Sequence, residues 1–170
     1  MRALLEERRG ALDQIEQAIA QLEKRKAPFP PNWTPDAPFS SFKGSLPWPT
    51  NRRRISSPYG RNRHPQLGTT TVNPGVDLEA NQGDPVRSVA YGQITRIAFI
   101  RGFGNTIIIS HGKGYYSVYA RLGDITVGEG EIISTGQVIG EVGESAPEGG
   151  FHFEIWSARQ SQDPLMWLKR

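Results

Sequence analysis

The stretch NTIIISHGKGYYSVYA, residues 105–120, consists of two apolar runs with the tetrapeptide HGKG between them. Isoleucine, valine and tyrosine favour strands, because branched and aromatic side chains pack well on a pleated surface. Gly112 and Gly114 of the tetrapeptide tolerate the positive φ angles of a tight connection. This stretch therefore predicts two antiparallel strands that meet in a hairpin turn at residues 111–114.

Further runs of the same kind precede and follow this hairpin, separated by turns that contain glycine. They lie too close together to leave room for helices between strands, which excludes a parallel sheet with helical crossovers. The sequence therefore predicts a mainly β fold, an antiparallel β-sandwich or barrel-like domain over residues 51–170. The predicted strands are Val86–Ala90, Gln93–Phe99, Asn105–Ser110, Tyr115–Ala120, Gln137–Val142 and Phe151–Trp156.

Residues 1–26 are predicted to form an N-terminal amphipathic helix. A helix of this length is marginal on its own and gains stability mainly by packing. Two interpretations fit the pattern: the helix is the end of a longer coiled coil, or it folds onto its own domain. The apolar residues recur at heptad spacing in two rows, one of Leu5, Leu12 and Ile19, the other of Ile15 and Leu22.

Residues 27–50 are predicted to form a linker. Their seven prolines favour extended chain and exclude a continuous helix or a central strand. Several aromatic residues make the segment too apolar for a freely solvated tether, so part of it is expected to pack on the domain. These residues are Trp33, Phe39, Phe42 and Trp48.

Positive charge is concentrated in residues 52–63, within a chain of net charge +3. Such a strip can attract an anionic partner, or it can keep an exposed strand from aggregating. We favour the second interpretation and expect no nucleic-acid partner, because no aromatic or glycine-rich nucleic-acid motif accompanies the charge. The basic residues are Arg52, Arg53, Arg54, Arg61 and Arg63, with no acidic residue among them.

Four short segments in a fixed order carry a further signal. They are Asn73-Pro74-Gly75-Val76-Asp77, Tyr119-Ala120-Arg121-Leu122, Gly150-Phe151-His152-Phe153-Glu154 and Asp163-Pro164-Leu165. They resemble segments of the lysostaphin/LytM-type metallopeptidases of bacterial cell walls, in which the first three read H-x-G-[IV]-D, Y-A-H-L and H-L-H-F-E. The match covers about residues 45–170 and implies the fold of that family.

In the resembled family five positions bind zinc or take part in catalysis, and only Asp77 and His152 keep the family's residues here. Asn73, Arg121 and Gly150 replace three histidines. A catalytic zinc needs three protein ligands and an open position for water, and an arginine has no acceptor with which to act as a base. The resemblance therefore implies no catalytic residue, with zinc absent or weakly held by the vestigial ligands.

Among members that have lost their histidines, the chain resembles EnvC-like murein hydrolase activators. This resemblance implies a protein of the bacterial periplasm or cell envelope that cuts nothing itself. It would bind and stimulate an N-acetylmuramoyl-L-alanine amidase during cell division, and contact a membrane division complex through a coiled coil upstream. The first residues hold no apolar export signal, so we expect a longer exported protein. The expected partner-binding groove comprises Asn73, Tyr119, Arg121, Gly150 and Phe151.

Three alternatives stay open. One is a zinc metalloendopeptidase that acts on peptidoglycan cross-links through a weakened site of Asn73, Asp77 and His152. Another is a non-catalytic module that binds peptidoglycan strands. The third is a biotinyl- or lipoyl-type carrier, suggested by a glycine motif at residues 127–140 and disfavoured because Lys113, in the hairpin turn, lies between glycines.

Overall fold

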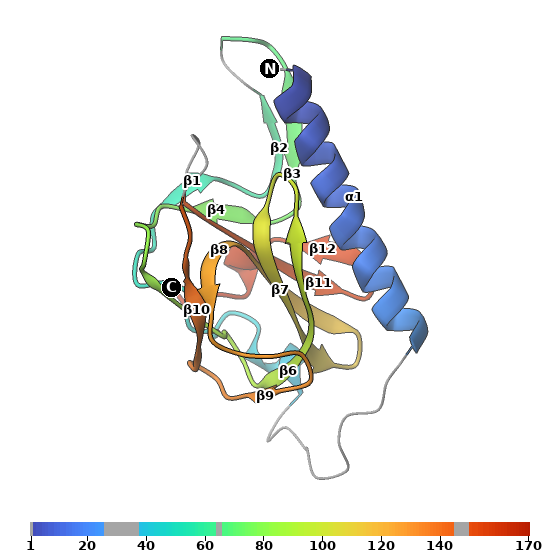
Figure 1. Cartoon of the computed structure of the whole chain (residues 1–170), viewed down its shortest axis with the longest axis vertical. Coiled ribbons are helices and arrows are strands. Elements are labelled where there is room, and N and C mark those ends of the chain that lie inside the picture. Colours follow the sequence, from blue (N-terminus) through green and yellow to red (C-terminus); the bar gives the residue numbers. More distant parts are fainter. Residues whose placement is uncertain (1, 26–37, 64–65, 145–149) are drawn as a thin grey trace.

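The apolar runs of the sequence form one large antiparallel sheet (Figure 1) in the computed structural model of the chain, which describes residues 2–25, 38–63, 66–144 and 150–170. Ten strands of the described residues belong to this sheet, and two more form a separate hairpin. A single α-helix of the described residues, α1, lies alongside the sheet. The mainly β fold with an N-terminal helix is therefore confirmed.

The strands follow one another along the chain with short connections. The helical elements are α1 (Arg2–Arg25), η1 (Phe39–Phe42) and η2 (Pro164–Met166). The strands are β1 (Ile55–Ser57), β2 (Gly60–Arg63), β3 (Thr70–Asn73), β4 (Val76–Leu78), β5 (Pro85–Arg87), β6 (Gly92–Ile100), β7 (Gly104–Gly112), β8 (Tyr115–Ile125), β9 (Ile132–Ile133), β10 (Val138–Val142), β11 (Phe151–Ser157) and β12 (Gln160–Gln162).

The centre of the large sheet is the predicted hairpin. Strands β7 and β8 pair antiparallel on either side of the turn, and the sheet continues in the order β1-β4-β11-β8-β7-β6-β9. Strand β12 pairs with β11, while β10 pairs with both β5 and β8. Strands β2 and β3 pair only with each other and project beyond the sheet (Figure 1).

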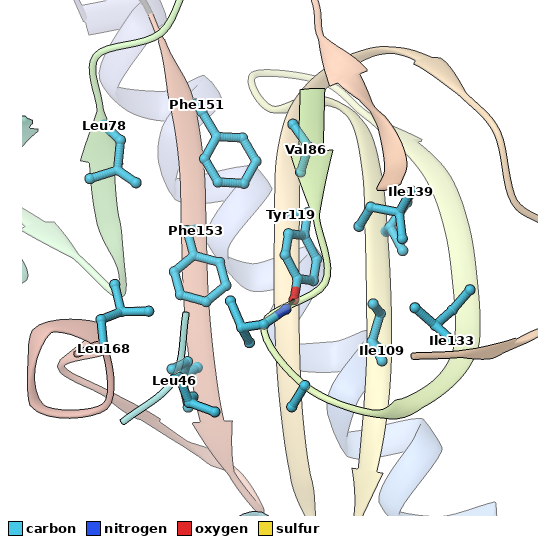
Figure 2. Close-up of a cluster of buried hydrophobic side chains, with 14 of the residues drawn as sticks. Leu46, Leu78, Val86, Ile109, Tyr119, Ile133, Ile139, Phe151, Phe153 and Leu168 are labelled. Carbon is cyan, nitrogen blue, oxygen red and sulfur yellow. Dashed lines mark hydrogen bonds between the residues drawn. The ribbon is translucent and has the colours of Figure 1, made fainter. Parts of the chain in front are cut away.

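Alternate residues of the central strands face two separate hydrophobic clusters, because successive side chains of a strand point to opposite faces. Tyr119 of β8 and both Phe151 and Phe153 of β11 lie in the main core, where Figure 2 shows them among aliphatic side chains from several strands. Val118 and Trp156, from the same two strands, face the other way.

Helix α1 covers this second face. Ala11, Ile15, Ala18 and Ile19 of the helix are buried, and they form one cluster with side chains of β6, β7, β8 and β11. The helix therefore folds onto its own domain, which is one of the two arrangements that its heptad pattern allows.

The C-terminal part of the predicted linker is packed against the domain. Phe39 stacks on the rings of both His111 and Trp167, with centroids 4.5 and 4.9 Å apart. Leu46 lies in the main core and forms a bridge to Leu168. The expected packing of the aromatic residues of this segment is thus found for Phe39, whereas Trp33 lies outside the described residues.

Candidate functional site

Asp77 and His152 face each other on neighbouring strands. Strand β4 pairs with β11 in a register that places the two residues directly opposite. The Nδ1 atom of His152 lies 2.7 Å from Oδ1 of Asp77, and Nε2 lies 2.7 Å from Oε2 of Glu154. Glu154 also accepts a hydrogen bond from the indole nitrogen of Trp156, at 2.6 Å. All four side chains are buried.

His152 is held between two carboxylates. Burial alone lowers the pKa of His152, but the charges and hydrogen bonds of Asp77 and Glu154 more than offset this effect and raise the pKa to about 9. Both ring nitrogens donate hydrogen bonds only when the imidazole is protonated. His152 is therefore an imidazolium at neutral pH, and neither nitrogen offers a free lone pair.

Arg121 supplies a second cation to Asp77. A β-bulge lies here. Asn105 and Ile107 of β7 are two positions apart, but their partners on β8, Leu122 and Tyr119, are three positions apart, so β8 has one extra residue. Arg121 adopts a φ of +62° within it, and its backbone N–H donates to the carbonyl of Phe103 at 2.6 Å. The guanidinium lies 3.4 Å from Oδ1 of Asp77, and its side chain is 6% exposed.

The polar atoms of Asn73 are used locally. Its side-chain oxygen accepts a hydrogen bond from the backbone N–H of Gly75 at 3.1 Å, which forms a turn between β3 and β4. Its amide nitrogen donates to the carbonyl and hydroxyl oxygens of Ser57. Asn73 therefore fixes the entry to β4, and no atom of its side chain contacts Asp77 or His152 in these hydrogen bonds.

Gly150 cannot carry a side chain in this backbone. It has a φ of +101°, and a Cβ atom built on it would lie 2.2 Å from the carbonyl oxygen of Leu78. A separation below about 3 Å is a severe overlap with backbone that cannot move freely. The position that carries a histidine in the resembled sequence pattern is therefore closed to any larger residue here.

The structure separates the five expected groove residues. Asn73 and Arg121 line one cavity, together with Asp77 and His152. Tyr119 and Phe151 are fully buried in the core on the opposite face of the sheet, and the hydroxyl of Tyr119 accepts a hydrogen bond from the backbone of Val89. These two residues are removed from the candidate binding surface, because a partner in the cavity cannot reach them.

The cavity has a volume of about 260 Å³ and lies between the sheet, the β2–β3 hairpin and helix α1. Arg9 and Leu12 of the helix form one wall, while Thr71 and Val72 of β3 form another. Phe103 closes the floor, and its ring stacks on His152 at 4.4 Å. None of these five lining residues was predicted as part of the site.

The residues of the site do not fit a catalytic zinc ion. Such an ion needs three ligands with free lone pairs, but both nitrogens of His152 are engaged and Asp77 is paired with two cations. A guanidinium beside the carboxylate also repels a metal cation. Among the described residues, no group of three or more His, Cys, Asp and Glu side chains is arranged to hold a metal.

The chain belongs to peptidase family M23, whose family model matches residues 71–164. The lysostaphin/LytM-type domain that the four segments indicate is thereby confirmed. None of the described helices is long and apolar enough to cross a membrane.

Three similar proteins illustrate the range of this family. The DD-carboxypeptidase/endopeptidase Mpg of Neisseria meningitidis is 39% identical over 66% of this chain, which spans 26% of that protein. A lipoprotein NlpD/LppB homolog of Pseudomonas aeruginosa is 32% identical over 59% of the chain and 34% of the relative. The structure of a zinc containing peptidase from Vibrio cholerae matches with a TM-score of 0.63 and 26% sequence identity. The match covers 72% of this chain and 40% of the peptidase chain.

This chain therefore spans about a third or less of the curated relatives just described. The shared part is the M23 domain, and proteins named as peptidases and as a lipoprotein both carry it. The residues of the site, rather than the family, must decide which of these activities the chain has.

Proposed function

We propose that the chain is a non-catalytic M23 protein that binds a periplasmic N-acetylmuramoyl-L-alanine amidase and stimulates it to split peptidoglycan during cell division. The observation that carries this proposal is the closed network of Asp77, His152, Glu154 and Arg121. In this network Asp77 and His152, the two positions that keep the family's metal ligands, are paired with each other and with Arg121 and Glu154, which supports a function without zinc.

The same network argues against direct hydrolysis. Metal-assisted hydrolysis needs a metal-bound water whose pKa is lowered toward neutrality and a base that accepts its proton. Arg121 has no acceptor atom, and His152 is already protonated between two carboxylates. The envelope is the proposed location, supported by the similarity to an NlpD/LppB lipoprotein.

Activation requires that the partner's active conformation be bound more tightly than its inactive one. The surface proposed to do this is the groove face of the sheet, where Asn73, Phe103 and Arg121 meet apolar side chains of the second cluster. Because α1 covers this face, we propose that the helix holds the groove closed until a division complex at the membrane displaces it.

The first experiment is the release of dye from labelled sacculi. The chain alone with zinc, an amidase alone, and the two together are compared at equal protein concentrations. Release that rises only in the mixture supports the activator. Release by the chain alone would instead establish a metallopeptidase.

A second arm separates the activator from a binding module. Co-sedimentation with sacculi, without any increase in amidase turnover, would show that the chain only holds peptidoglycan strands. An Arg121→Gln variant tests the groove itself. It should lose stimulation of the amidase, and circular dichroism should show that it still folds.

A further inference from the structure

Two short helical turns, η1 and η2, lie next to each other on the surface of the domain. The carbonyl of Trp167, which follows η2, accepts hydrogen bonds from the backbone N–H groups of Gly44 and Leu46, at 3.0 Å each. Leu46 also forms a bridge to Leu168, and Figure 2 shows both side chains in the main core. The two turns and the residues that follow them therefore form one continuous surface.

This surface exposes apolar side chains from both turns. Phe42 of η1 is 38% exposed, and Leu165 and Met166 of η2 are 36% and 61% exposed. We call these three side chains the turn patch. Apolar side chains that gather on a surface, rather than lying singly, mark a site of contact with a membrane or with another protein.

Exposed cations border the turn patch. The Nζ atom of Lys43 lies 5.5 Å from the centre of the Trp167 ring. The indole nitrogen of Trp48 donates a hydrogen bond to the carbonyl of Lys169, and the guanidinium of Arg53 lies 5.7 Å from the centre of the Trp48 ring. These contacts hold three cationic side chains around the two turns, where all three are exposed.

Little negative charge opposes these cations. Residues 38–54 and 163–170 together contain six basic residues and a single acidic one, Asp163. The carboxylate of Asp163 already accepts a hydrogen bond from the backbone N–H of Leu165, at 3.0 Å. The surface around the turn patch is therefore positive as well as partly apolar.

The surface of an anionic bilayer fits this combination best. Apolar side chains enter the headgroup region, while lysine and arginine attract the anionic headgroups around them. Three partly exposed side chains are too few for a stable protein interface, which buries about 800 Å² on each partner. A second copy of the chain in a twofold contact would bring the same cations face to face.

We infer that the turn patch and its bordering cations bind the surface of a membrane that contains anionic phospholipids. The two turns pack on the main core through Phe39 and the adjacent Trp167, whereas α1 packs on the second cluster. The turn patch and α1 therefore lie on opposite sides of the sheet, and the bound chain keeps its groove face directed away from the membrane. This binding is a property of the chain alone and does not rest on amidase activation.

The test is co-sedimentation of the full chain with vesicles of phosphatidylcholine alone and with vesicles that also contain phosphatidylglycerol. Binding is expected only to the anionic vesicles. Added salt should release the chain, because it screens the attraction between exposed charges. The double variant Lys43→Glu, Lys169→Glu should bind about 25-fold more weakly, since each basic residue near an anionic surface raises the affinity roughly fivefold.

Matched variants assign the binding to the turn patch. Met166→Ser removes its most exposed apolar side chain and should weaken binding several-fold. Phe99→Ser removes an apolar side chain of β6 that is 74% exposed, and it should have no effect. The double variant Arg61→Glu, Arg63→Glu makes the same change of charge on β2 and should weaken binding far less than the change at the two lysines.

Several results would overturn the inference. Equal binding to both kinds of vesicle would mean that charge takes no part, and absence of binding to the anionic vesicles would exclude a membrane as the partner. Equal losses in the lysine and β2 variants would show that the basic chain as a whole is attracted, and not the turn patch. A dimer in sedimentation velocity that Met166→Ser dissociates would show that a second copy covers the patch instead.

Discussion

At the scale of single residues, Arg121 decides what Asp77 can bind. Its guanidinium lies where it neutralises the carboxylate permanently, and no change of pH within the folded range removes that charge. A zinc ion could enter only by displacing both Arg121 and His152 from Asp77. The replacement of one histidine by arginine thus changes the electrostatics of the whole site and not only one ligand.

Zinc should therefore leave the melting temperature of the chain unchanged. The double variant Asn73→His, Arg121→His offers two new nitrogen ligands beside Asp77, so zinc should raise its melting temperature by several degrees, as expected for a ligand that binds only the folded state. Differential scanning fluorimetry with zinc or a chelator measures this. The single variant Arg87→His, which adds a histidine elsewhere, is the control, and a zinc-dependent rise in the unaltered chain would contradict the prediction.

Two buried histidines should give the stability of the chain opposite dependences on pH. Burial lowers the pKa of His111 from 6.5 to about 4, opposed only in part by its hydrogen bond to the carbonyl of Tyr91. The contribution of His111 to the free energy of unfolding is present above pH 6.5. It is lost as the pH falls toward 4, because the unfolded state takes up the proton at a higher pH than the folded state does. His152, whose pKa is raised to about 9, contributes fully below pH 6.5 and loses this contribution as the pH rises through 9.

The free energy of unfolding should consequently be greatest near pH 6.5. Urea titrations between pH 5 and 9.5 measure it, and His111→Gln should flatten the acidic side without changing the alkaline side. A stability that keeps rising from pH 7 to 9 would mean that His152 is not an imidazolium in the folded chain.

The resemblance to LytM-type sequences predicted that Asp77, His152 and Arg121 lie close together, since the family's metal-binding and catalytic residues stand at these three positions. It failed for Tyr119, since simple alternation places Tyr119 and Arg121 on one face of β8, whereas the bulge turns Arg121 to the other face. Phe151 is adjacent to His152 on a strand, so its place on the opposite face follows from the period of two. The cavity walls depend on tertiary packing that no local pattern encodes.

At the scale of elements, α1 is held by apolar contacts rather than by charge. Ile15 and Ile19 are fully buried against the sheet, and the hydroxyl of Tyr116 donates to Glu23 at 2.6 Å near the end of the helix. Ile15→Asp should release the helix, because an unpaired carboxylate in an apolar contact costs several kcal/mol. Binding to the proposed amidase should then become at least tenfold tighter, as measured by biolayer interferometry.

The adjacent exposed residue provides a matched control. Gln14→Asp places the same charge one position earlier on the solvent side of α1 and should change neither helix docking nor amidase binding. Hydrogen exchange of the helix amides reports the docking independently. If Ile15→Asp undocks α1 without tighter binding, the helix does not regulate access to the groove.

The elements themselves were predicted unevenly. Strands β6, β7, β10 and β11 agree with their predicted ranges to within two residues at each end. Strand β5 ends at Arg87, three residues before its predicted end, β8 continues five residues further to Ile125, and the two-residue β9 was not predicted. Strands β1 and β2 lie within residues 52–63, where the charge pattern favoured an exposed strand without giving its bounds. The short strands β3 and β4 were not predicted. The sequence also left the position of α1 undecided, since a heptad pattern fits both a coiled coil and a helix packed on a sheet.

At the scale of the whole molecule, the cooperative unit begins before residue 51. Phe39 and Leu46 are 4% and 2% exposed in the main core, and the indole nitrogen of Trp48 donates to the carbonyl of Lys169 at 2.7 Å. Each large apolar side chain removed from a core costs about 2–5 kcal/mol, while a domain has only about 5–15 kcal/mol in total. The predicted boundary at residue 51 therefore cuts through the core.

A chain of residues 38–170 should accordingly fold without α1, whereas a chain of residues 51–170 should be largely unfolded. The second hydrophobic cluster lies on the outer face of the sheet, so loss of α1 exposes it without opening the main core. Near-ultraviolet circular dichroism and urea titration distinguish the two chains, and Phe39→Ala in residues 38–170 should lower the urea midpoint toward that of the shorter chain. Equal midpoints for the two chains would show that residues 38–50 only cover the core, and that the stabilising contacts all lie beyond residue 51.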